Sequence, residues 1–378
     1  MIKDILASSR ELPKISPETA DAYAQAIDKL KDNVNGQLEA NPKIMELIGR
    51  NPLDVMRNNH RNHATFMATI FKLNSFELLA RTVPWVYRAY HARGFSYDYF
   101  PIELVAWQIA IHQCLDNSAR KSEILAVYKW MVQHHGDMIK LSRTGEGLSF
   151  SVQREANAMQ QVFLSLLLHG DTQGCLKLVD QSIQTADDMK HFYLDVIWPA
   201  MYRIGELWET NQISVAEEHL STAIVGRVMA ALYPRFALFE ITRGKVIVSA
   251  GPNEFHEVGA RMVADFMEMD GWDVTFLGAN TPASELLNLL KQYKPFVLAL
   301  SVATVFNLES ARQMIQMIHD DLETRSIKVM VGGLAFNGMP QLWQTIGADG
   351  FAADAESALQ VSDDWWVAEN SDNAYARA

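Results

Sequence analysis

The segment from Lys245 to Gly259 constrains the fold of this chain more than any other part of the sequence. An apolar run, Val246–Val248, is followed by a turn that contains one histidine, His256, and a helix-like pattern begins near Gly259. A strand, a turn and a helix in this order favour a parallel sheet, and open sheets of that kind bind ligands at the carboxyl ends of their strands. We therefore expect His256 to project from that edge of a sheet.

The rest of the C-terminal part, residues 241–378, alternates between strand and helix patterns. Its strand candidates are rich in Val, Ile and Leu, as expected for parallel strands that are buried on both faces. They are Lys245–Ser249, Trp272–Leu277, Phe296–Ser301, Lys328–Val331 and Gly350–Phe351, with helices predicted over 257–269, 283–292, 308–323 and 340–346. This alternation predicts a doubly wound, Rossmann-like α/β domain.

The two parts before residue 241 have helical patterns. Residues 1–150 carry apolar residues at helical spacing, and residues 141–149 are predicted to form a linker. Residues 151–240 contain breaks at 169–174, 185–188 and 209–212, which divide them into four helices with short connections. The expected fold class is therefore α + α/β, with an N-terminal helical domain, a four-helix bundle and the Rossmann-like domain.

Composition excludes several classes of function. The formal net charge of −12 argues against non-specific binding of nucleic acid. The two cysteines, Cys114 and Cys175, fit a reducing cytoplasm and form neither a disulfide framework nor a zinc site. The N-terminal residues are too polar for a signal peptide, and no apolar run approaches the length of a membrane span. We expect a cytoplasmic protein that binds neither a membrane nor DNA directly.

Several residues predict a ligand slot around His256. Glu254 is close enough to accept a hydrogen bond from the imidazole, which would fix its tautomer and make the other ring nitrogen a better metal donor. Small residues end two neighbouring strands: Ser301 and Thr304 after one, Gly332 and Gly333 after the other. The turn lacks the Gly-x-Gly-x-x-Gly spacing of a dinucleotide site.

These segments resemble the cobalamin-binding module of corrinoid methyltransferases, mutases and light-sensing cobalamin-dependent repressors. The family signature is Asp-x-His-x-x-Gly with Ser-x-(Leu/Thr) and Gly-Gly strand ends, and this chain has Glu254-x-His256-x-x-Gly259, Ser301-x-Ala303 and Gly332-Gly333. The resemblance implies the base-off, His-on mode, in which His256 binds cobalt and the dimethylbenzimidazole tail enters the slot near Ser301 and Gly332. The family's Asp is Glu254 here, one methylene longer, and we expect its hydrogen bond to survive.

The bundle resembles the cap of the light-sensing repressors and of methionine synthase. In the photoreceptor branch a Trp, followed ten residues later by Glu-His, covers the upper face of the cofactor and its adenosyl group. Trp208, Val215, Glu218 and His219 occupy those positions here. The resemblance thus implies adenosylcobalamin, although a buried Trp in a methyl-corrinoid carrier would give the same pattern. The His that directly follows the Trp in the repressors is Glu209 here, which puts a His–cobalt–His state through that position in doubt.

The N-terminal domain resembles sensor globins around His91, Arg93 and Tyr97, where a histidine on a helix precedes a glycine and aromatic residues. A globin-like pocket can hold haem or a bilin. The segment 57–63 together with Arg81, Arg88 and Arg93 offers donors for propionates. Because photocobilins pair a cobalamin module with a biliverdin-binding domain, the resemblance implies non-covalent biliverdin. The alternatives are haem, or an aromatic helical core with a surface histidine.

Taken together, the sequence predicts a light-sensing signalling protein and not an enzyme. Loss of the adenosyl group in the light would change domain packing or oligomeric state, and the expected partners are a second copy of the chain or a separate effector protein. Two alternatives remain: a corrinoid carrier for methyl transfer, and a haem-linked gas or redox sensor with a cobalamin module.

Overall fold

A computed structural model of the chain describes residues 1–378 except 117, 146–156, 237–239, 340 and 377–378. The chain divides into two compact units, one of residues 1–149 with 209–212 and one of residues 150–208 with 213–378.

The first unit is helical. Its elements are α1 (Ile2–Arg10), α2 (Pro17–Gln25), α3 (Ile27–Glu39), α4 (Ile44–Leu47), α5 (Leu53–Leu73), α6 (Phe76–Ala92), α7 (Tyr99–Cys114), α8 (Ser118–Gln133) and α9 (His135–Thr144). Large side chains form the centre of the core, among them Phe71, Phe95, Tyr99, Trp107 and Tyr128, each no more than 1% exposed. Burial of side chains of this size supplies most of the stabilisation of such a helical unit.

The predicted linker over residues 141–149 is partly wrong. Helix α9 continues to Thr144 and ends at Gly145, whose φ of 73° is readily adopted only by glycine. Met138 and Leu141 bury their side chains, which explains why the helix extends beyond the region of clear periodicity. Residues 146–149 lie outside the described part of the chain.

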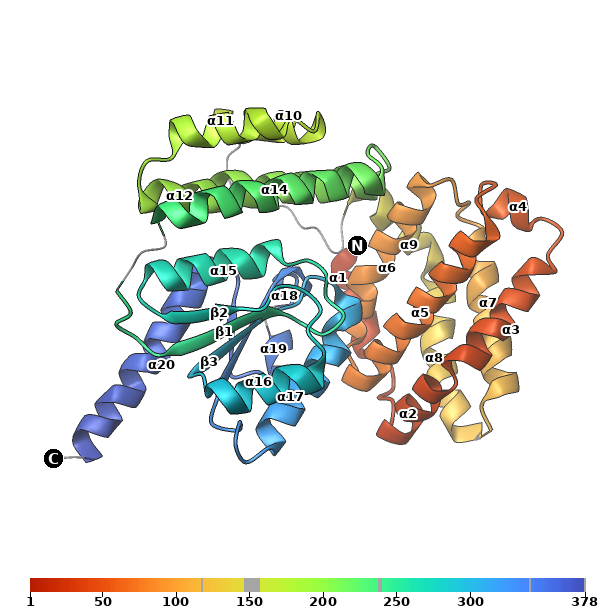
Figure 1. Cartoon of the computed structure of the whole chain (residues 1–378). Coiled ribbons are helices and arrows are strands. Elements are labelled where there is room, and N and C mark those ends of the chain that lie inside the picture. Colours follow the sequence, from red (N-terminus) through yellow and green to blue (C-terminus); the bar gives the residue numbers. More distant parts are fainter. Residues whose placement is uncertain (117, 146–156, 237–239, 340, 377–378) are drawn as a thin grey trace. The chain divides into compact units, whose positions relative to one another are not determined.

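The second unit begins with the helices of the bundle (Figure 1). They are α10 (Ala158–Leu168), α11 (Thr172–Ser182), α12 (Ala186–Phe192), α13 (Trp198–Glu209) and α14 (Val215–Phe236), and a π-helical turn, η1 (Tyr193–Ile197), joins α12 to α13. The breaks near residues 169–174, 185–188 and 209–212 are where the sequence predicts them. The break before α12 has a physical cause, a capping box in which the Thr185 and Asp188 side chains bond each other's backbone.

The α/β domain contains one parallel sheet in the order β2-β1-β3-β4-β5. The strands are β1 (Lys245–Ala250), β2 (Asp273–Phe276), β3 (Val297–Ser301), β4 (Lys328–Gly332) and β5 (Gly350–Ala352). The helices are α15 (Val258–Met269), α16 (Ala283–Tyr293), α17 (Leu308–Asp320), α18 (Leu334–Asn337), α19 (Leu342–Thr345) and α20 (Ala355–Ala376), with a 3₁₀ turn, η2 (Val305–Asn307).

The predicted fold class is confirmed in its main features, a helical N-terminal region and a Rossmann-like domain with a parallel five-stranded sheet. The predicted strands agree with the observed ones to within a residue at each end. Helix α17 ends at Asp320 and not at residue 323, and two helices, the short α18 and the long C-terminal α20, have no counterpart in the prediction. The globin-like character of the first unit stays a prediction.

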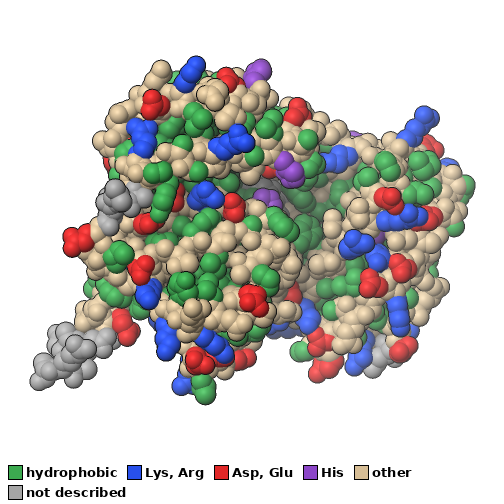
Figure 2. Space-filling model, in the orientation of Figure 1, with side chains coloured by type: hydrophobic (Ala, Val, Ile, Leu, Met, Phe, Trp, Pro, Cys, Tyr) green, Lys and Arg blue, Asp and Glu red, His purple; other side chains and the backbone are tan. Residues whose placement is uncertain are grey.

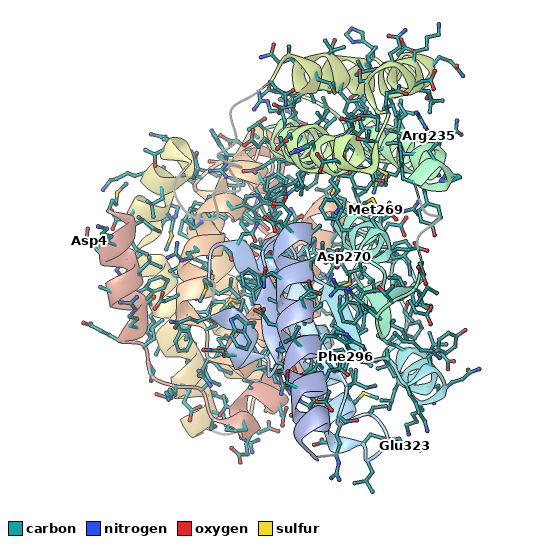
Figure 3. All side chains as sticks on the ribbon, turned by 90° about the vertical axis from the view of Figure 1, so that its left-hand side faces the viewer. Asp4, Arg235, Met269, Asp270, Phe296 and Glu323 are labelled. Atoms are coloured by element: carbon teal, nitrogen blue, oxygen red, sulfur yellow. The ribbon has the colours of Figure 1, made fainter. Side chains whose placement is uncertain are left out.

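The faces of the sheet are covered by helices. Helices α15 and α20 lie on one face and α16 and α17 on the other (Figure 1). Trp272, Phe296 and Trp366 seal the side under α20, with ring centroids 5.2 to 6.2 Å apart, and Figure 3 shows Phe296 beside this helix. On the other side of α15 lies the bundle, where the Tyr193 hydroxyl donates to Asp265 at 2.7 Å.

Strands β1 and β3 are neighbours although β2 separates them in sequence, so the chain direction across the sheet reverses between them. Such a switch point is where doubly wound sheets bind ligands. The register pairs Ala250 with Ser301 and Ser301 with Gly332 at the carboxyl edge. Among the residues that the structure describes, no helix is both long enough and apolar enough to span a bilayer.

Candidate functional site

The loop between β1 and α15 presents His256 at the switch point. Strand β1 ends at Ala250 and α15 begins at Val258, so seven residues form the turn. Asn253 in this turn has a φ of 63°. The loop is fixed to the next strand of the switch point, because the Gly251 amide donates to the Ser301 carbonyl at 2.8 Å.

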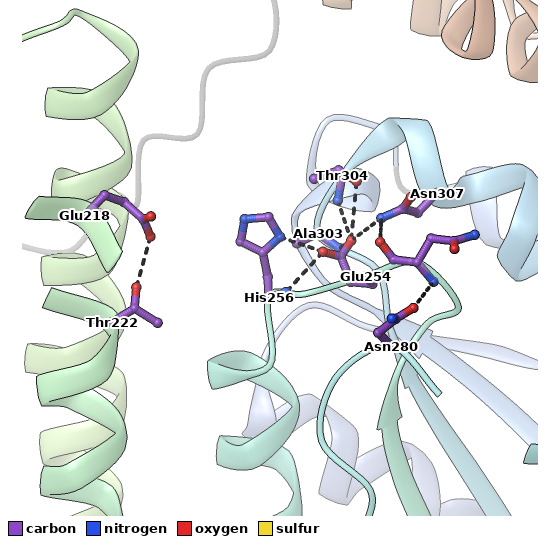
Figure 4. Close-up of polar contacts among 9 residues, drawn as sticks. Glu218, Thr222, Glu254, His256, Asn280, Ala303, Thr304 and Asn307 are labelled. Atoms are coloured by element: carbon purple, nitrogen blue, oxygen red, sulfur yellow. Dashed lines mark hydrogen bonds and ion pairs between the residues drawn. The ribbon is translucent and has the colours of Figure 1, made fainter. Parts of the chain in front are cut away.

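Glu254 is buried beneath the loop and accepts hydrogen bonds from several directions (Figure 4). Its Oε2 accepts from the backbone amides of Ala303 and Thr304 at 2.9 and 3.0 Å, and from the side-chain amide of Asn307 at 3.1 Å. Burial favours the neutral acid, but hydrogen bonds from His256, Thr304 and Asn307 lower the pKa of Glu254 to about 2. The carboxylate is therefore ionised at neutral pH.

His256 receives its orientation from this carboxylate. Its Nδ1 lies 2.5 Å from Glu254 Oε1, and its backbone amide donates to the same oxygen at 3.2 Å. An ionised carboxylate can only accept, so Nδ1 carries a proton, and in the neutral imidazole the lone pair is on Nε2. The hydrogen bond to Glu254 raises the pKa of His256, although burial acts in the opposite direction. The imidazole remains 64% exposed and can bind a metal through Nε2.

Helix α14 of the bundle carries three of the four predicted cap residues, Val215, Glu218 and His219. Glu218 accepts hydrogen bonds from Thr222 Oγ1 at 2.9 Å and from His219 Nδ1 at 2.5 Å. Figure 4 shows Glu218 and Thr222 on α14, opposite His256. The negative charge of Glu218 also raises the pKa of His256, although less than Glu254 does, so both carboxylates act on the same imidazole.

The other predicted cap residues belong to the same pair of helices. Val215 begins α14 with 52% of its surface exposed, and the His219 side chain is 74% exposed. Trp208 lies half-buried on the last turn of α13. Figure 2 shows histidine and apolar side chains at the hollow between the bundle and the α/β domain. The second unit thus brings Trp208, Val215, Glu218 and His219 onto the helices that face the His256 loop.

The small residues at the strand ends have a structural cause that differs from the predicted one. A Cβ on Gly333, whose φ is 98°, would lie 2.5 Å from the Val302 carbonyl oxygen, and one on Gly332 would lie 2.7 Å from the Ala352 carbonyl oxygen. Neighbouring backbone therefore demands glycine at both positions, whether or not a ligand is present. At Gly259 an added Cβ would meet nothing within 4 Å, so there is open space beside the start of α15.

The donor set fits a corrinoid. In the described part of the chain, no three side chains of His, Cys, Asp or Glu are grouped as a metal ion would need. A single exposed imidazole with its second nitrogen fixed by a carboxylate suits a metal that brings its own equatorial ligands. Gly259, three residues after His256, is exposed, and an added Cβ there would meet nothing within 4 Å.

In the first unit, two of the three predicted bilin residues, His91 and Tyr97, contact each other. His91 Nδ1 donates to the Phe95 carbonyl at 3.0 Å, and its ring stacks on Tyr97 with centroids 4.0 Å apart. The Tyr97 hydroxyl lies 3.3 Å from Ser142 Oγ, and Arg93 donates to the Ala89 carbonyl at 2.9 Å. A role of His91, Arg93 and Tyr97 in binding a tetrapyrrole stays a prediction.

Sequence analysis gave one residue the wrong role and missed three others. His60 lies in the segment 57–63 that was assigned to propionates, but it is fully buried, with Nδ1 2.6 Å from Asn35 Oδ1 and Nε2 2.8 Å from the Tyr99 hydroxyl. This burial rules out its predicted role as a donor to an incoming ligand in this conformation. Asn253, Asn280 and Asn307 around Glu254 were also missed, and only the left-handed tendency of asparagine in turns could have drawn attention to the first two.

Comparison with known proteins agrees with this geometry. Two families, each described as a B12 binding domain, match residues 244–361 and 159–233. The HTH-type transcriptional repressor CarA of Myxococcus xanthus is 27% identical over 58% of this chain and 72% of its own length. CarH of the same organism is 26% identical over 50% of this chain and 62% of its own length.

Corrinoid proteins are also similar to this chain. Dimethylamine corrinoid protein 3 of Methanosarcina acetivorans is 23% identical over 42% of this chain and 74% of its own length. Among solved structures, the monomethylamine corrinoid protein of Methanosarcina barkeri is 18% identical, with a TM-score of 0.48 over 54% of this chain and 98% of that one.

A helical bundle beside a switch-point histidine whose Nδ1 is held by a buried carboxylate suits a protein that binds a preformed metal complex. The matched regions identify the class more closely: residues 159–233 and 244–361 are B12 binding domains, which places these two regions of the chain in the cobalamin-binding family. The family predicted from Glu254, His256 and Gly259 is thereby confirmed.

Proposed function

We propose that this protein is a light sensor that binds adenosylcobalamin, with His256 as the lower ligand of cobalt, and that it is not an enzyme. The observation that carries the proposal is one arrangement: an exposed, oriented imidazole, His256, on the α/β domain, and the Glu218–His219 pair on α14 of the bundle opposite it. Similarity to the CarA and CarH repressors supports it, since the same Trp and Glu-His spacing marks the photoreceptor branch.

Each residue has a defined task in this proposal. Glu254 holds the Nδ1 proton of His256 and keeps Nε2 directed out of the loop. Trp208 packs on the adenosyl group, and Glu218, held by Thr222, bonds its polar atoms. Ser301 and the backbone around Gly332 and Gly333 line the slot for the nucleotide tail. When bound, adenosylcobalamin supplies a cobalt–carbon bond that visible light breaks.

The response arises from the contact between cap and cofactor. With no adenosyl group against it, Trp208 loses a packing partner, and α13 and α14 can adopt a second position on the α/β domain. A ligand that stabilises one of two packings shifts their populations when it is removed. We propose that a change in oligomeric state, or binding to a separate effector protein in the cytoplasm, reads out this shift.

The test is an absorption spectrum of the protein with adenosylcobalamin, recorded in the dark and after illumination, followed by sizing chromatography. We expect a His-on spectrum that changes irreversibly in the light, and a change in elution. Trp208→Ala should reduce the preference for adenosylcobalamin over methylcobalamin by about 1 kcal/mol, close to fivefold. Equal affinity ratios in variant and parent would favour the second candidate, a methyl-transfer carrier, which the similarity to methylamine corrinoid proteins supports.

For the first unit we propose non-covalent binding of biliverdin near His91, with haem as the alternative. The support is local: His91 stacked on Tyr97, with the Arg143 guanidinium 5.3 Å from the centre of the Tyr97 ring. Titrating biliverdin and haem into the full chain separates the two, because haem gives a sharp Soret band and a bilin a broad red band. A red band that is unchanged in His91→Ala would remove this histidine from the site.

A further inference from the structure

Three asparagines surround the ligand loop, one from each of three chain segments at the carboxyl edge of the sheet. Asn253 lies in the loop itself, Asn280 in the connection between β2 and α16, and Asn307 in η2 after β3. Asn253 and Asn280 have φ values of 63° and 54°, in the left-handed region that asparagine adopts more readily than most residues.

Asn280 holds the loop at two successive residues. Its side-chain Oδ1 accepts from the Asn253 amide at 3.1 Å, and its own backbone amide donates to the Glu254 carbonyl at 2.9 Å. The first bond depends on the side chain of residue 280, whereas the second depends only on its backbone conformation.

Asn307 holds the loop from the opposite side. Its Nδ2 donates to the Asn253 carbonyl and to Glu254 Oε2, both at 3.1 Å. The Asn253 side chain in turn donates to Ser310 Oγ on α17 at 3.2 Å. The backbone of residue 253 and the carboxylate of residue 254 are thus fixed relative to β3 and α17 (Figure 4).

We propose that Asn253, Asn280 and Asn307 form a clamp that positions Glu254 and His256 for cobalt before cobalamin binds. The clamp consists only of hydrogen bonds within the chain, so its formation does not require the cofactor. It rests on the proposed ligation of cobalt by His256, and it adds that Asn280 and Asn307 are positioning residues that act through Glu254. A ligand loop ordered in advance loses less conformational entropy on binding.

Paired substitutions at residue 280 separate the side-chain bond from backbone conformation. Asn280→Gly keeps the left-handed φ and removes the acceptor, whereas Asn280→Asp keeps an acceptor at the same position. Asn307→Ala removes both donors on the other side. Asn74→Gly is the matched control, because Asn74 also has a positive φ, of 50°, and its side chain bonds another segment, but it lies in the first unit.

Two measurements on the full chain test the clamp. In the apoprotein, hydrogen exchange of the peptide that spans residues 251–257 should be faster in Asn280→Gly and Asn307→Ala than in the parent, Asn280→Asp and Asn74→Gly. With cobalamin, the first two variants should bind 10- to 100-fold more weakly, as is usual when partners of a metal ligand are removed, and should show more of the spectrum without bound histidine. Asn280→Asp should restore the parental spectrum.

The outcomes that overturn the clamp differ from those that overturn the proposed function. Parental exchange rates, affinity and spectrum in Asn280→Gly and Asn307→Ala would refute the clamp, as would an equal loss of binding in Asn74→Gly. A parent protein that shows no His-on spectrum would instead refute cobalt ligation by His256, and the exchange measurement on the apoprotein would still decide whether the asparagines hold the loop.

Discussion

The two units each place a glutamate beside a histidine, and the two pairs behave in opposite ways. In the first unit, Glu103 Oε1 lies 4.0 Å from His60 Nε2, and the side chains are 6% and 0% exposed. In the second unit, Glu254 and His256 are 2.5 Å apart, and the side chains are 1% and 64% exposed. Both carboxyl groups are buried, so burial alone does not decide their charge.

The number of hydrogen-bond donors decides it. Burial raises the pKa of Glu103 to about 7, although the hydrogen bond from Trp107 Nε1 at 3.2 Å acts in the opposite direction. Glu254 has two backbone amides and the Asn307 amide around Oε2, besides His256 at Oε1, and its pKa falls to about 2. A buried carboxyl with one donor tends to stay neutral, and one with several stays ionised.

The two histidines differ in how many of their ring nitrogens are hydrogen-bonded. Burial lowers the pKa of His60 to about 4, and Asn35 and Tyr99 occupy both of its ring nitrogens. His256 uses only Nδ1 for Glu254, and the described residues offer its Nε2 no hydrogen bond. The first pair is thus a closed network within a helical core, whereas the second holds an exposed imidazole in a fixed orientation.

The largest effect that this contrast predicts is at His256 itself. His256→Ala should remove the His-on spectrum and weaken cobalamin binding by more than the roughly 100-fold upper range for partners of a ligand. Absorption spectra and binding isotherms measure both. His191→Ala, an exposed histidine on α12, is the control and should resemble the parent. A His-on spectrum in His256→Ala would break the contrast by showing that another group binds cobalt.

The next largest effect concerns the Glu103–His60 pair and the free energy of unfolding. Because the folded pKa of Glu103 is above its usual value, its stabilising contribution is fully present below about pH 4.5 and is lost as the pH rises through about 7. Glu103→Gln stays neutral, so at pH 8 it should be more stable than the parent by up to about 3 kcal/mol, with little difference at pH 4.5. Urea unfolding at both pH values measures this. A loss of stability at pH 8 would show that ionised Glu103 is paired.

A glutamine at the ionised carboxylate, Glu254, should instead be harmful, and the quantity affected is the affinity for cobalamin. Glu254→Gln keeps one acceptor oxygen but places an amide among donors from Ala303, Thr304 and Asn307. Cobalamin binding should weaken by about 10- to 100-fold, about 1.4 to 2.7 kcal/mol, because the imidazole loses its charged partner. Titration of the variant with cobalamin gives the affinity, and parental affinity would show that ionisation of Glu254 has no role in ligation.

The Glu254–His256 pair could be predicted from the sequence and the Glu103–His60 pair could not, for a physical reason. Glu254 and His256 are two residues apart, and the strand before them is a continuous apolar run, so the spacing alone specifies the geometry. His60 and Glu103 are on different helices, and nothing in the polar segment 57–63 shows that its two histidines, His60 and His63, turn towards the core. Asn253, Asn280 and Asn307 likewise meet only because parallel strands place distant loops at one edge.

The smallest effect is expected at Thr304, which the sequence assigns to the cofactor slot. Its backbone amide donates to Glu254 at 3.0 Å, whereas its hydroxyl lies 3.4 Å from the same oxygen, near the limit of a useful hydrogen bond. Thr304→Val keeps the shape and the amide and removes only the hydroxyl, so cobalamin affinity should fall less than about fivefold, within 1 kcal/mol. Binding isotherms for this variant beside Asn307→Ala give the comparison. If the hydroxyl instead bonds the bound cofactor, the loss in Thr304→Val would equal or exceed that in Asn307→Ala, and the residue would belong to the ligand-facing surface and not to the donors that keep Glu254 charged.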